Sequence, residues 1–157
     1  MFNPLALPRP VEEIEVRTFT DPRQPGAELT LTAISTADYT RKMKAQELNE
    51  GYINEFIGEG KFRLIVAGKK VEVTLHLCSV IASVVSMLVD VPTIEVPDKD
   101  GNPKSQPWDF KCWVALAVNM PDAFDEMVTW VNALVQKSKV SASGDPEVPN
   151  GFAGSSD

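Results

Sequence analysis

The sequence predicts an α+β fold, in which a small antiparallel sheet of two N-terminal hairpins packs on a mainly helical body of about four helices. Two alternating segments flank a turn near the N-terminus, and helical apolar periodicity recurs from residue 36 to residue 137. A length of 157 residues with 43% hydrophobic composition suits one domain that buries a core. We therefore expect an extended arm over residues 1–12, a single domain over 13–137 and a disordered tail over 138–157.

The arm and the tail are assigned from composition. Three prolines within the first ten residues remove backbone donors and disfavour a helix, and no basic segment precedes an apolar run as it would in a signal peptide. Residues 138–157 are rich in Ser, Gly and Pro, so their apolar content is too low to offset the entropy of ordering.

The first hairpin is predicted over residues 14–34. Side-chain polarity alternates along 14–20 and again along 28–32, which is the period-2 pattern of half-buried strands. The turn between them contains Asp21-Pro22 and Pro25-Gly26, in which proline presets φ and glycine gives conformational freedom. Residues 62–66 and 71–73 form a second, shorter hairpin, which we expect to extend the first into one sheet.

Four helices follow from capping residues and apolar periodicity. The first covers residues 36–57, with Ser35 or Thr36 as its cap, and Gly51 marks a bend or an early stop. The second, capped by Thr74, covers 75–91 and is apolar except for one polar stripe. The third starts at Ser105 or Pro107 and continues to residue 118, and the fourth covers 121–137 with one clear apolar face. Residues 92–107 are expected to be a polar, mobile connection, extended at 93–96 and turning at 98–102.

Charge and cysteine content exclude several classes of function. Twenty-two acidic against fifteen basic residues give a net charge of −7, which would repel nucleic-acid phosphates and anionic membranes. The longest apolar stretch, residues 77–89, is shorter than a membrane-spanning helix. Cys78 and Cys112 both fall inside apolar helical patterns, as buried free thiols do, and this favours a reducing cytoplasm.

The residues of catalysis and metal binding do not form a recognisable set. His76 and Asp90 share the polar stripe of the second helix, but helical rise would separate them by about 20 Å, too far for a hydrolase triad. The Asp98–Asn102 segment lacks the later ligands of a calcium loop, since Pro107 occupies the place of the bidentate glutamate. One histidine and two isolated cysteines do not make a zinc site. We therefore expect no enzyme activity, no cofactor and no bound metal.

Aromatic and methionine side chains are the candidate partner contacts. Trp130 lies at the edge of the last helix's apolar face, and Trp108 stands at a helix start beside a loop; both positions suit either a core rim or an interface anchor. Met87 and Met127 are two further candidate partner contacts, because the flexible thioether side chain of methionine can adapt to partners of different shape. Met43 and Met120 provide the same type of side chain.

The segment Glu15–Thr32 with its Asp-Pro-x-x-Pro-Gly turn, the helix after it and the later run Met120–Val128 resemble the tail assembly chaperones of long-tailed bacteriophages. This resemblance covers residues 14–136 in order of elements. It implies a non-enzymatic factor of the host cytoplasm, absent from the mature virion, that keeps the tape measure protein soluble and promotes polymerisation of the tail tube protein. It also implies self-association and a longer product made by ribosomal frameshifting. The alternative is a structural virion component, such as a head-tail connector or decoration subunit.

Overall fold

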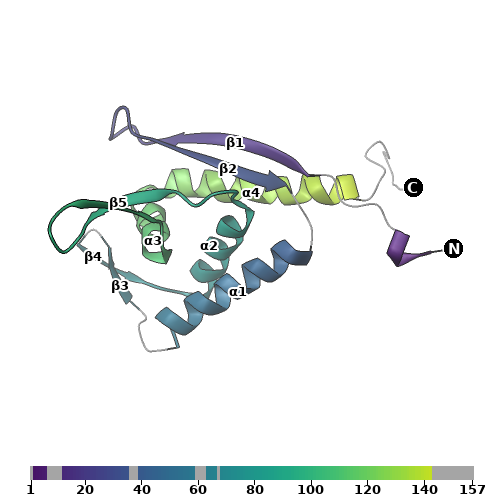
Figure 1. Cartoon of the computed structure of the whole chain (residues 1–157), viewed down its shortest axis with the longest axis horizontal. Helices are drawn as coiled ribbons and strands as arrows, with labels where there is room; N and C mark the ends of the chain where they lie inside the picture. Colours follow the sequence, from purple (N-terminus) through teal and green to yellow (C-terminus); the bar gives the residue numbers. More distant parts are fainter. Residues whose placement is uncertain (1, 7–11, 36–38, 59–62, 67, 143–157) are drawn as a thin grey trace.

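A computed structural model describes residues 2–6, 12–35, 39–58, 63–66 and 68–142, with side chains described up to residue 137. Within these ranges the fold is α+β, as predicted: it combines three antiparallel hairpins with four α-helices (Figure 1). The helices are α1 (Tyr39–Phe56), α2 (Leu75–Met87), α3 (Phe110–Asn119) and α4 (Pro121–Ala142). A short 3-10 turn, η1 (Pro4–Ala6), lies within the predicted arm, and residues 143–157 of the predicted tail lie outside the described residues.

The predicted first hairpin is present as β1 (Glu13–Thr20) and β2 (Glu28–Ser35). Its register runs from Glu13 opposite Ser35 to Thr20 opposite Glu28, and Gly26 in the turn has a positive φ of 86°. Leu29, Leu31 and Ala33 of β2 face inward, and the register places Phe19, Arg17 and Glu15 opposite them. The alternate residues of β1, which include Ile14 and Val16, therefore point to solvent.

The second hairpin does not extend the first, so that prediction is wrong. β3 (Arg63–Val66) pairs only with β4 (Lys69–Glu72), on the opposite side of the helices from β1 and β2 (Figure 1). The outer edge of β2 is met instead by the segment after α2: Ala33 bridges to Leu88, and the Val89 amide donates to the Thr32 carbonyl at 2.8 Å. The predicted connection is a third hairpin, β5 (Thr93–Pro97) with β6 (Pro103–Pro107). The extended segment at 93–96 and the turn at 98–102 are confirmed, and the strand at 103–107 is the part that the prediction lacks.

Several predicted helix ends are also corrected. Helix α2 stops at Met87 rather than residue 91, because Leu88 turns extended and pairs with Ala33. Helix α3 begins at Phe110, capped by Asp109, while Ser105 and Pro107 belong to β6. Ser35 does not cap α1: it ends β2, and its hydroxyl accepts a hydrogen bond from the Glu13 amide at 3.0 Å. Helix α4 continues to Ala142, past the predicted domain boundary at residue 137.

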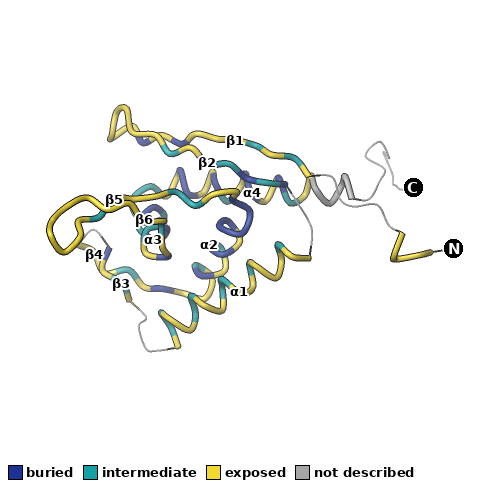
Figure 2. Tube along the Cα trace, viewed as in Figure 1, coloured by how far each residue is buried: buried dark blue, intermediate teal, exposed yellow. Residues whose placement is uncertain are grey.

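The core lies between the first hairpin and helices α2, α3 and α4, where buried positions concentrate (Figure 2). Helix α1 has no fully buried residue and covers the core from outside, with its Tyr52 and Phe56 rings 4.4 and 4.8 Å from the ring of Phe110. None of the described helices is long and apolar enough to cross a membrane.

Candidate partner-binding groove

Three of the four predicted partner contacts lie in the core, so they do not form part of the exposed surface. Met87, Met127 and Trp130 are 2%, 0% and 3% exposed. Met127 and Trp130 are three residues apart on α4, on the face that packs beneath the first hairpin, and Met87 ends α2 just before the chain pairs with β2. Only Trp108 is partly exposed and remains available to a partner.

The surroundings of Trp130 explain its position at the border of the apolar face. Its ring lies 6.1 Å from that of Phe19, the Arg17 guanidinium stands 5.8 Å from its centroid, and its Nε1 donates to Glu15 Oε1 at 3.1 Å. This hydrogen bond, with help from the Lys137 ammonium, lowers the pKa of the Glu15 carboxyl. Trp130 therefore fastens β1 to α4 from inside the molecule.

Trp108 lies in an open groove along α3, which we call the α3 groove. The groove has a volume of about 660 Å³ and is bounded by the first turn, β3, the β5–β6 hairpin and α3. Most of its lining is apolar, and this is the concave, mainly apolar shape that binding sites have. Its lining residues are Arg23, Gln24, Val66, Ile94, Val96, Gln106, Trp108, Asp109, Lys111, Cys112, Ala115, Leu116, Asn119 and Met120.

One stripe of α3 forms a side of this groove. Cys112, Ala115, Leu116 and Asn119 follow the spacing i, i+3, i+4, i+7, so they share one helical face. Ile94 and Val96 of β5 also line the groove, and the Trp108 ring is fixed by an edge contact with Trp113 at 4.8 Å. The apolar periodicity of the sequence predicts this helical stripe, whereas the contact with β5 depends on the pairing of β5 with β6, which local periodicity does not indicate.

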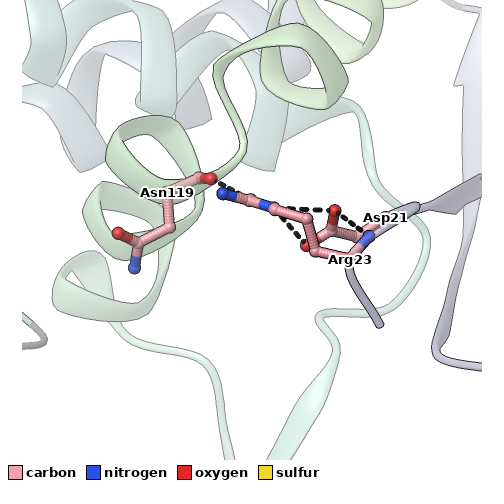
Figure 3. A network of polar contacts seen from close by, with 3 residues as sticks. All are labelled: Asp21, Arg23 and Asn119. Atoms are coloured by element: carbon pink, nitrogen blue, oxygen red, sulfur yellow. Dashed lines mark hydrogen bonds and ion pairs between the residues drawn. The ribbon is translucent and has the colours of Figure 1, made fainter. Parts of the chain in front are cut away.

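A polar network ties the first turn to the end of α3 (Figure 3). Asp21 accepts hydrogen bonds from Arg23 Nε at 3.0 and 3.2 Å and from the Arg23 amide at 3.0 Å. Arg23 Nη2 donates to the carbonyl of Asn119, at the negative end of the α3 dipole. The side-chain hydrogen bond from Arg23 lowers the pKa of Asp21, and Asp21 in turn raises the pKa of Arg23. This network shapes the end of the groove where the Arg23 side chain lies.

The polar groups of the groove are suited to binding and capping. The Asp109 carboxylate accepts from the Cys112 amide at 3.0 Å as the cap of α3, and burial raises the pKa of the Cys112 thiol, which keeps it protonated at neutral pH. Cys78 is also a free thiol and, unlike the partly buried Cys112, is fully buried; this burial raises its pKa. Across the part of the chain that the structure describes, no three His, Cys, Asp or Glu side chains gather as a metal site would require. The groove thus offers apolar contact area with a few hydrogen-bonding groups at its edge.

The chain was compared with protein-family models, curated proteins and solved structures, and none of them matches it.

Proposed function

We propose that the protein is a bacteriophage tail assembly chaperone that binds apolar helices of the tape measure protein in its α3 groove. The observation that supports this most directly is an open, mainly apolar groove of about 660 Å³ on an acidic protein. The turn phrase Asp21-Pro22 to Pro25-Gly26, which the resemblance depends on, contributes Arg23 and Gln24 to one end of that groove. Binding there keeps the tape measure protein soluble while the tail tube protein polymerises around it.

A groove of this kind suits an amphipathic helix. Helix-in-groove recognition uses apolar anchors that lie against a hydrophobic channel, and the channel gains from side chains that adapt in shape. Trp108 and Met120 supply an aromatic anchor and a flexible thioether to the lining. The net charge of −7 would hold the loaded complex in solution by repulsion between complexes.

The first test is co-expression with a tape measure protein, the long helical partner that the proposal names. The expected result is that most of that protein moves from the insoluble to the soluble fraction and co-purifies with this chain. An unchanged soluble fraction would contradict the proposal.

Substitutions locate the binding surface. Ile94→Glu places a carboxylate in the groove and should abolish the gain in solubility, and Trp108→Ala should reduce it severalfold. Ile65→Glu, at an exposed isoleucine outside the groove lining, is the matched control and should behave as wild type. Equal effects of Ile94→Glu and Ile65→Glu would show that the groove is not the binding surface.

Detection of the protein in purified virions would favour the alternative of a structural virion component.

A further inference from the structure

The first hairpin has one edge that no described residue pairs with. The outer edge of β2 is occupied by the Leu88–Val89 segment, whereas β1 pairs with β2 alone among the described strands, so its other edge has no strand partner there. β1 is eight residues long, and on its solvent face Ile14 and Val16 are 66% and 61% exposed. An edge strand of this length with exposed apolar side chains is a template for pairing with another strand.

We propose that β1 pairs with β1 of a second copy of this chain, antiparallel and about a two-fold axis at Val16. The two hairpins then form one continuous four-stranded sheet, in the order β2, β1, β1 of the second copy, β2 of the second copy. This inference concerns a different surface from the α3 groove and does not depend on the proposed chaperone function.

The charge pattern of β1 selects this register. In a two-fold antiparallel pair, residues that lie opposite one another point to the same face. An axis at Val16 places Glu15 opposite Arg17 of the second copy, and Arg17 opposite the second Glu15. An axis at Glu15 or at Arg17 would put two like charges directly opposite, and an axis at Ile14 would put Glu13 opposite Glu15.

An axis at Thr18 is the remaining choice near the middle of the strand. It would pair only residues 16–20, so Ile14 and Glu15 would both lie beyond the paired segment, with Glu15 next to Asp21 of the second copy. The axis at Val16 instead sets Val16 against Val16 and Ile14 against Thr18, so both exposed apolar residues gain a cross-strand neighbour.

The charged pair is already held in position within one copy. Glu15 accepts from Trp130 Nε1 at 3.1 Å and from Lys137 Nζ at 3.4 Å, and Arg17 lies over the Trp130 ring. Less side-chain freedom is therefore lost when the two strands meet. An edge strand accepts an extended segment, and self-complementarity of charge about Val16 identifies the occupant as a second copy.

Sedimentation of the full chain over a range of concentrations up to about 1 mM tests the association. The wild type should show a reversible monomer–dimer equilibrium. Val16→Lys should raise the dissociation constant at least about tenfold, because two ammonium groups then meet at the axis. Ile65→Lys introduces the same charge at an isoleucine that is 62% exposed on β3, and it should dimerise as wild type does. Circular dichroism of each variant checks that its fold is intact.

A cross-linking experiment tests the register. In a Cys112→Ser background, Val16→Cys should form an intermolecular disulfide on mild oxidation, since residues facing each other across the axis have Cα atoms close enough to bridge. Thr18→Cys is the control and should not, because the two copies of residue 18 would be offset by four residues, about 13 Å along the strand.

A monomer at every concentration would overturn the proposal. So would a dimer that Val16→Lys leaves intact, or equal cross-linking through residues 16 and 18.

Discussion

At the scale of single residues, Asp21 helps to connect the turn of the first hairpin to the end of α3, a contact between residues that are 96 positions apart in the chain. It holds Arg23, and Arg23 donates to the Asn119 carbonyl at the end of α3. Its pKa is lowered from the usual 3.8 because Arg23 hydrogen-bonds to the charged form. Its stabilising effect is therefore complete above the unfolded-state pKa and is lost as the pH falls through the lower folded-state pKa.

Asp21→Asn should accordingly lower the urea midpoint at pH 7, and the difference from wild type should shrink as the pH is lowered below about 3.8. Urea unfolding at pH 7 and near pH 2.5 measures this. Asp125→Asn, at an exposed position of α4, should change the midpoint little at either pH. A gap between Asp21→Asn and wild type that is as wide at pH 2.5 as at pH 7 would rule out the ionised carboxylate as the source of the stability.

For the tryptophans, the sequence alone does not distinguish a core position from a partner-binding position. In the sequence, Trp108 stands at a helix start beside a loop and Trp130 at the edge of an apolar helical face, and a core rim and an interface anchor have the same local pattern at such positions. Trp130 is buried because β1 lies across it and Glu15 supplies an acceptor for its indole nitrogen. That acceptor is 115 residues away in the chain, so no local pattern could indicate it.

At the scale of elements, the start of α2 shows how much a local signal can predict. Thr74 has extended backbone angles, and its hydroxyl accepts from the Leu77 amide at 3.0 Å, so the predicted cap is confirmed.

Thr74→Ala should cost about 1 kcal/mol of unfolding free energy, because one amide of the first turn loses its partner. Urea unfolding measures the change. Thr129→Ala, on the exposed face of α4, should cost nothing measurable, since alanine is the better helix former. Equal losses for the two variants would show that the cap contributes no stability.

The other end of α2 shows where local signals fail. Residues 88–91 continue the apolar pattern, yet the helix ends at Met87 because Leu88 forms a bridge with Ala33 on β2. Residues 103–107 likewise contain two prolines and only exposed side chains, but they form β6 through pairing with β5. Helical periodicity and a threonine cap are encoded within a few residues, whereas these strand partners are chosen by contacts made elsewhere in the chain. The α3 groove could not be predicted for the same reason, because it forms only where β5 lies next to α3.

At the scale of the whole molecule, α4 connects the first hairpin to the other helices. It contacts β1, β2, α2 and α3, and its Trp130, Met127 and Leu134 belong to the single core cluster that also includes Trp113 of α3. Because the first hairpin shares this core instead of forming its own, it should not detach before the helices unfold.

Tryptophan fluorescence at two places in the core tests this cooperativity. Trp130→Phe leaves Trp108 and Trp113, which report on α3, and the double variant Trp108→Phe, Trp113→Phe leaves Trp130, which reports on the contact between β1 and α4. In urea, the fluorescence transition of each variant should coincide with its own far-ultraviolet circular dichroism transition, as expected for all-or-none unfolding of one core. Comparing the two probes within each variant removes the stability cost of the substitutions themselves. A Trp130 transition that precedes the loss of helix would show instead that the hairpin opens as a separate unit, and β1 would then be presented to other strands without the support of α4.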